Sequence, residues 1–154
     1  MPVNYKQNYV GWWKQFSEFI RFERAENKCE QCGVPNGEII DRGFISHVQK
    51  VPIWFDGAGG TYHAETGKYL GMFRSYDLDL QRMTKIVLTV AHLDYDGGIC
   101  QCKKIHGIKC AIPSHCKALC QRCHLAIDMP SHIENRRNAL KIAKDAKRTL
   151  FEVL

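Results

Sequence analysis

Two pairs of cysteines, each with a two-residue spacer, constrain this chain more than any other feature. Cys29 and Cys32 form the first pair, and Cys120 and Cys123 form the second, which runs directly into His124. The spacer lets both sulfurs of a pair reach one ion at about 2.3 Å, and four thiolates complete the tetrahedron that Zn²⁺ prefers. The pattern therefore predicts a structural zinc site that joins two distant parts of the chain.

Other uses of the eight cysteines are less consistent with the sequence. The chain begins Met1-Pro-Val-Asn-Tyr-Lys without an apolar signal stretch, which favours a reducing compartment and free thiols over disulfides. A thioredoxin-like site would need one CxxC beside a βαβ pattern, and the segment between the pairs offers none. The sequence contains no run of eighteen apolar residues, so no membrane span is predicted. We expect a cytoplasmic protein with no membrane partner.

Length and charge narrow the class further. The 154 residues suit a single domain, 1–154, which would bury about 68–70% of its unfolded surface. The formal net charge of +6 suits a partner that carries phosphate groups.

The hydrophobic pattern predicts three kinds of segment. An apolar stripe of helical period predicts a helix over residues 12–25 that packs on a core through Trp12, Phe16, Phe19 and Ile20. Residues 38–84 read as an irregular insertion of loops and short strands, and residues 85–94 read as the clearest strand. Pro130 is expected to end the helix that carries His124, and Ser131 to cap a new helix that runs to about Leu150.

Two segments of this chain resemble the signature of the HNH nuclease family. They are the strand Val87-Leu-Thr-Val-Ala-His92 and the segment Ser114-His115-Cys-Lys-Ala-Leu-Cys120-Gln-Arg-Cys123-His124. Arg24-Ala-Glu-Asn-Lys-Cys29-Glu-Gln-Cys32-Gly is similar to the knuckle that precedes the signature in zinc-containing members. The resemblance covers about half the chain. It implies an α+β fold with a ββα-metal core, stapled by a four-cysteine zinc site and flanked by an N-terminal helix and a long basic C-terminal helix.

The same resemblance implies metal-dependent hydrolysis of DNA phosphodiester bonds, often in phage, mobile-element or defence settings. His92 stands at the position of the general base, and a neutral imidazole is suited to that role because it titrates near pH 6.5. His124 stands at the position of a ligand of the catalytic ion.

Two positions depart from the family pattern. Ala91 occupies the position of an acidic metal ligand, and Asp94, on the strand face of His92, is the expected replacement. His115 occupies the position of the middle asparagine, which shifts the expected ion from Mg²⁺ toward Mn²⁺, Ni²⁺ or Zn²⁺. The alternative function is therefore a catalytically degenerate HNH scaffold that binds nucleic acid or a protein without cutting.

A cysteine-rich insertion spans about residues 97–114. Its thiols, together with the one that follows it, make a second set of four: Cys100, Cys102, Cys110 and Cys116. A second structural zinc is one interpretation of this set. Buried free cysteines are the other, because the spacing is looser than that of paired CxxC motifs.

Basic residues recur at helical spacing near the C-terminus. They are Arg137, Lys141, Lys144 and Arg148, and Arg122 lies beside the second cysteine pair. Such a stripe can follow a DNA backbone or can simply be a solvated helix face. DNA is the expected partner, and a homodimer or a protein partner stays open.

Overall fold

The computed structural model describes residues 11–45, 51–93 and 111–152, with side chains up to residue 144. The chain forms two compact units, Met1–His124 and Leu125–Leu154. Asp94, Cys100, Cys102 and Cys110, and the side chain of Arg148, lie outside the described residues.

The N-terminal helix begins as α2 (Trp13–Glu18) and continues as a π-helical turn, η1 (Phe19–Arg24). Phe16 and Ile20 are buried, which confirms the predicted helix and two positions of its apolar face. Trp12 and Phe19, predicted on the same face, are 53% and 40% exposed. The buried stripe is therefore narrower than the sequence pattern suggested.

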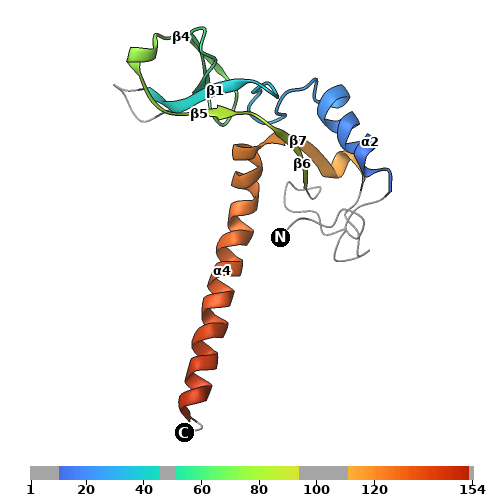
Figure 1. Ribbon diagram of the computed structural model, residues 1–154, viewed down its shortest axis with the longest axis vertical. Coiled ribbons are helices and arrows are strands. Elements are labelled where there is room, and N and C mark those ends of the chain that lie inside the picture. The colour runs from blue at the N-terminus through green and yellow to red at the C-terminus, as the bar shows by residue number, and fades with distance from the viewer. Residues whose placement is uncertain (1–10, 46–50, 94–110, 153–154) are drawn as a thin grey trace. The chain divides into compact units, whose positions relative to one another are not determined.

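Residues 39–85 form a five-stranded antiparallel sheet, where loops and short strands were expected (Figure 1). Its order is β4-β3-β2-β1-β5. A core of Ile53, Phe55 and Leu78 packs on this sheet. The strands are β1 (Ile39–Ile45), β2 (Pro52–Phe55), β3 (Gly60–His63), β4 (Tyr69–Met72) and β5 (Leu78–Lys85), with the short 3-10 helix η2 (Ser75–Asp77) before β5.

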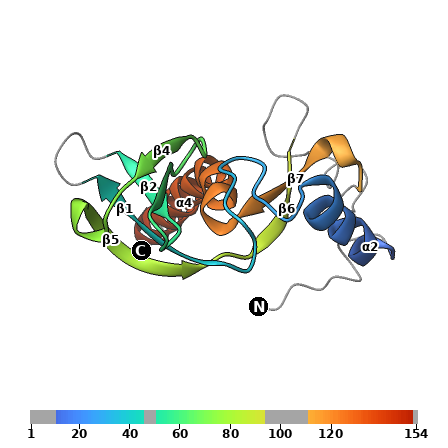
Figure 2. The ribbon, with the colours of Figure 1, turned by 90° about the horizontal axis from the view of Figure 1, so that it is seen from above.

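A separate two-stranded sheet pairs β6 (Leu88–His92) with β7 (Cys116–Cys120). The 3-10 helix η3 (Pro113–His115) leads into β7. The strand predicted over residues 85–94 begins later in the structure, at Leu88. Lys85 is the last residue of β5, and two residues separate it from β6. Figure 2 shows β5 running on toward β6, so one stretch of chain links both sheets.

The C-terminal helix α4 (Gln121–Glu152) is continuous, and the predicted end at Pro130 is wrong. A proline φ near −65° is itself helical, so Pro130 removes one backbone donor without forcing the chain out of the helix. The Ser131 hydroxyl, predicted to cap a new helix, instead donates to the Asp128 carbonyl at 2.8 Å. This bond lies within the helix and does not begin a new one.

The fold class is mixed α+β, with antiparallel sheets and a C-terminal helix, as predicted. Among the described residues, no helix combines the length and the apolar character needed to cross a membrane.

Candidate metal centre

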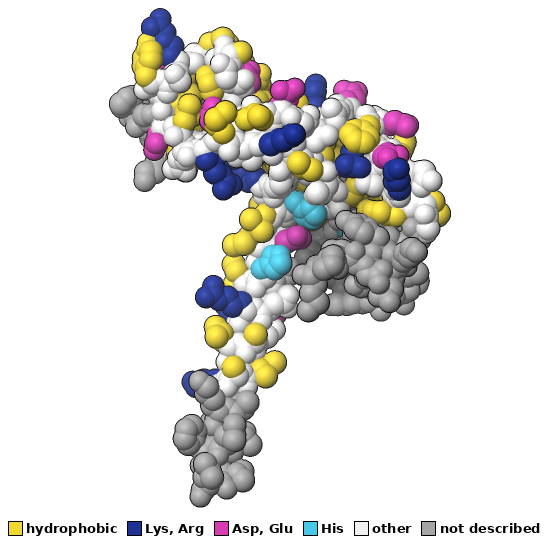
Figure 3. Space-filling model, viewed as in Figure 1, with side chains coloured by type: hydrophobic (Ala, Val, Ile, Leu, Met, Phe, Trp, Pro, Cys, Tyr) yellow, Lys and Arg dark blue, Asp and Glu magenta, His cyan; other side chains and the backbone are white. Residues whose placement is uncertain are grey.

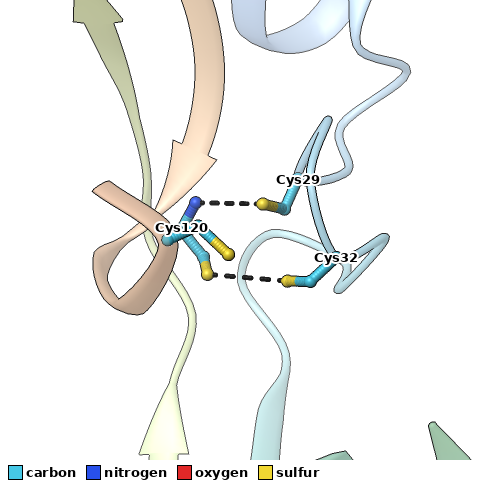
Figure 4. A group of neighbouring side chains, drawn as sticks. Cys29, Cys32 and Cys120 are labelled. Carbon is cyan, nitrogen blue, oxygen red and sulfur yellow. Dashed lines mark hydrogen bonds between the residues drawn. The ribbon is translucent and has the colours of Figure 1, made fainter. Parts of the chain in front are cut away.

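The two cysteine pairs come together in space, as predicted. The sulfurs of Cys29, Cys32, Cys120 and Cys123 all lie within 4.8 Å of one another, and all four residues are buried. The Sγ atoms of Cys32 and Cys120 are 3.7 Å apart (Figure 4). Sulfurs at the corners of a tetrahedron around Zn²⁺, each about 2.3 Å from the ion, would be about 3.8 Å apart. The donor set and its spacing fit a zinc ion.

A tight turn presents the first pair. The Cys29 amide donates to the Val34 carbonyl at 3.0 Å, and the Gly33 amide donates to the Cys29 carbonyl at 2.8 Å. Gly33 has a φ of +69°, a conformation that a side chain would disfavour. The loop is thus closed by its own backbone, and both thiols point to one side of it.

The second pair lies at the junction of a strand and a helix. Cys120 is the last residue of β7, and Cys123 lies in the first turn of α4. The Cys120 amide donates to the Cys29 sulfur at 3.4 Å (Figure 4). The change from strand to helix turns the chain within one residue, which brings both sulfurs onto the same centre.

The four thiols perturb one another because their sulfurs all lie within 4.8 Å of one another. The contact with Cys123 lowers the pKa of Cys120, and the contact with Cys120 raises the pKa of Cys123 and of Cys32. For Cys29, the contact with Cys120 acts to raise the pKa, but the contacts with Cys123 and Cys32 outweigh it, and the pKa falls to about 6. Zinc binds thiolates, so binding displaces these shared protons.

The five-stranded sheet supports the centre from one side. The Trp54 indole N–H on β2 donates to the Cys32 carbonyl at 3.2 Å. Arg42, which pairs with Trp54 in the β1–β2 register, donates from Nη2 to the Cys120 sulfur at 3.7 Å. Gly67, in the β3–β4 turn, lies so close that a Cβ there would be 2.6 Å from the Cys32 oxygen. The sheet is therefore part of the wall around the cysteines.

A charged contact links the loop of the first cysteine pair, Cys29 and Cys32, to the β6–β7 hairpin. Oε2 of Glu30 accepts hydrogen bonds from the Ala118 amide and from Arg24 Nη2, each at 2.5 Å. Arg24 also donates to the carbonyls of Pro113, at 2.7 Å, and Cys116, at 2.8 Å. One hydrogen-bond network thus holds together the end of η1, the loop of the first cysteine pair and β7.

Two of the predicted site histidines lie at the end of the hairpin where residues 93–115 connect β6 to β7. His92 is the last residue of β6, pairs with Cys116 and stacks on Trp13. His115 immediately precedes β7, and its carbonyl accepts a hydrogen bond from the Leu93 amide at 2.6 Å. The hairpin therefore brings the backbones of His92 and His115 close together.

His124 contacts strand β6 through Thr89, which by strand alternation lies on the face opposite to that of His92. Its Nδ1 lies 2.7 Å from the Thr89 hydroxyl, and that hydroxyl lies 3.4 Å from the Leu119 carbonyl. A carbonyl can only accept, so the consistent arrangement has Thr89 donating to Leu119 and accepting from Nδ1–H. In that tautomer Nε2 carries the lone pair of the ring, as in a metal-binding histidine oriented by a second hydrogen bond.

The remaining predicted residues are not gathered with the four cysteines. Cys116 is buried in β7, and its three expected partners lie outside the described residues. Arg122 donates to the Ala64 carbonyl at 2.7 Å and forms an ion pair with Glu65 at 3.6 Å. On α4, exposed basic side chains stand among exposed apolar ones (Figure 3). The exposed basic residues of the predicted stripe are Arg137, Lys141 and Lys144.

Four residues of the site were missed by sequence reasoning: Trp13, Glu30, Arg42 and Thr89. Each of these residue types also occurs in ordinary secondary structure, and each residue acts through a contact distant in sequence. The separation between Arg42 and Cys120, for example, is 78 residues. No local pattern signals such contacts.

The four cysteines define a group that could hold a metal ion such as zinc, in an α+β protein. No protein-family model, curated protein or solved structure matches the chain.

Proposed function

We propose that this chain is a metal-dependent endonuclease that hydrolyses DNA phosphodiester bonds at an HNH-type ββα-metal site. The observation that carries the proposal is the order β6, β7, α4, an antiparallel hairpin that passes without a loop into a helix. His92 ends the first strand and His124 lies in the first helical turn. The four cysteines lie at the strand-to-helix junction, where a structural zinc would hold the hairpin.

In this proposal His92 acts as the general base. Its imidazole would take a proton from the water that attacks the phosphorus, in line with the departing 3′ oxygen. Its backbone is fixed by pairing with Cys116, and the next residue, Leu93, is bonded to His115. A base held on a paired strand is placed more firmly than one on a loop.

The donors available to a catalytic cation are mostly imidazoles. His124 offers Nε2 and His115 offers a second ring, whereas Ala91 offers no donor. Such a set suits Mn²⁺ or Ni²⁺ better than Mg²⁺. Among the residues that the structure describes, the tetracysteine group is the one cluster of three or more candidate ligands. We assign the missing carboxylate to Asp94, and a bound ion would polarise the phosphate.

The test is nicking of supercoiled plasmid by the zinc-loaded protein with Mg²⁺, Mn²⁺ or Ni²⁺. We expect nicking that is fastest with Mn²⁺ or Ni²⁺ and is lost in His92→Ala. His63→Asn is the matched control, because an asparagine oxygen can replace Nδ1 as the acceptor for the amides of Glu65 and Thr66. Nicking by His92→Ala at the parent rate would remove His92 from the mechanism.

A second candidate is a degenerate HNH scaffold that binds nucleic acid or a protein without cutting it. Ala91 favours it, because this position is 1% exposed and its side chain offers no donor to a metal ion. The same plasmid experiment separates the two. A band shift without nicks in any of the three metals would support the binding scaffold.

A further inference from the structure

We infer that Trp13 is a positioning residue that fixes the plane of the His92 imidazole. This inference rests on the proposed role of His92 as the general base. The Trp13 and His92 rings have centroids 5.2 Å apart and planes inclined by 18°. Two flat rings in this arrangement cover one another, so one face of the imidazole is occupied by the indole.

The indole also contacts a second aromatic ring, that of Phe16. Its centroid lies 5.4 Å from that of Phe16, with the planes inclined by 40°. Phe16 is 5% exposed and belongs to the buried face of the N-terminal helix. The helix therefore supplies a supported aromatic surface rather than a loose side chain.

The strand alone would leave the imidazole less defined. Pairing of β6 with β7 fixes the His92 backbone, but the second torsion of a histidine side chain has a broad distribution. Stacking on Trp13 restricts that torsion to angles at which the two rings are nearly parallel. The contact thus fixes the plane of the imidazole, and both ring nitrogens lie in that plane.

Orientation matters for a general base because the nitrogen lone pair must point at the water it deprotonates. Loss of the indole would leave the base present but misdirected for much of the time, which lowers kcat more than it changes KM. The indole face would also favour the imidazolium formed after proton transfer, through a cation–π contact.

Histidine-labelled, zinc-loaded protein allows the stack to be tested by NMR without reference to activity. The ring current of Trp13 should move the His92 carbon-bound protons upfield, and Trp13→Leu should shift them downfield. Trp13→Phe should retain part of the upfield shift. Trp12→Leu is the matched control, since the Trp12 ring contacts Phe16 edge-on at 5.7 Å, and it should leave the His92 signals in place.

The plasmid assay then tests the consequence for catalysis. We expect Trp13→Leu to lower kcat about tenfold with little change in KM, and Trp13→Phe to recover part of the loss. Unchanged His92 signals in Trp13→Leu, or nicking by this variant at the parent kcat, would overturn the inference. If the parent protein does not nick DNA but Trp13→Leu still shifts the His92 signals, the stack stands and the proposed function fails.

Discussion

The guanidinium of Arg42 donates from Nη2 to the sulfur of Cys120 at 3.7 Å, which links the five-stranded sheet to the second cysteine pair. Four thiolates around one Zn²⁺ carry a net charge of about −2. A cation that donates to one sulfur offsets part of this charge where water has little access. Its other terminal nitrogen, Nη1, is buried and has no hydrogen-bond partner among the described residues, so Arg42 is held at a cost that the thiolate contact offsets.

Arg42→Met should therefore release zinc faster than the parent protein, because methionine fills similar apolar volume but donates no hydrogen bond. A charge-assisted hydrogen bond of about 1.5–3 kcal/mol corresponds to a release roughly ten-fold or more faster. Zinc transfer to a coloured chelator measures the rate. Arg82→Met is the matched control, because Arg82 pairs with Arg42 across β1 and β5 and is exposed. Equal rates for parent and Arg42→Met would show that the contact does not hold the metal.

Glu30 should be important for stability out of proportion to its exposure. Glu30→Ala leaves the Ala118 amide and the Arg24 guanidinium without this acceptor, and we expect the free energy of unfolding to fall by about 2 kcal/mol. Glu30→Gln keeps an oxygen acceptor and should lose less. Urea denaturation of zinc-loaded protein measures the difference, with the exposed Glu23→Ala as the control. A Glu30→Ala variant as stable as Glu23→Ala would contradict the role of this network.

Zinc removal should destabilise the fold strongly, because the free energy of binding to a folded tetrathiolate site adds to the free energy of folding. We expect a strong chelator to lower the midpoint of thermal unfolding by about 20 °C or more. Chelator already saturated with zinc is the control. Acidification should also lower the midpoint of thermal unfolding, since protons compete with zinc for the thiolates. A midpoint that does not respond to chelator would argue against a structural metal.

The exposed basic residues of α4 should contribute to DNA binding through phosphates. Removal of Arg137, Lys141 and Lys144 together should weaken binding and reduce the slope of log K against log salt by about one per lost contact. Fluorescence anisotropy with labelled duplex DNA measures both quantities. The control removes an equal charge from exposed residues of the other unit, Lys14, Lys28 and Lys68. If both triple variants bind equally, the stripe is a solvated helix face.

The sequence predicted that the four cysteines come together, because their spacing obeys a local rule. A CxxC spacer is readable without knowledge of the fold, and two such pairs leave few alternatives. The N-terminal helix and the strand ending at His92 were also predicted, since each has a long apolar pattern. The resemblance to HNH nucleases and the roles it implies stay predictions.

The five-stranded sheet was not predicted as such because three of its strands have only four residues, too few to show clear alternation. Its stability comes from pairing between strands and from the cluster around Ile53, which no single segment reveals. The predicted helix end at Pro130 was wrong for a different reason. Its effect on a helix depends on neighbouring turns that a residue-level rule does not weigh.

X-ray absorption at the zinc K-edge tests the tetracysteine centre most directly. We expect one class of scatterers in the first shell, four sulfurs at about 2.3 Å, and replacement of one sulfur by a lighter atom in Cys120→Ser. A first shell made of nitrogen and oxygen in the parent protein, or purified protein without zinc that keeps its full thermal stability, would contradict the account.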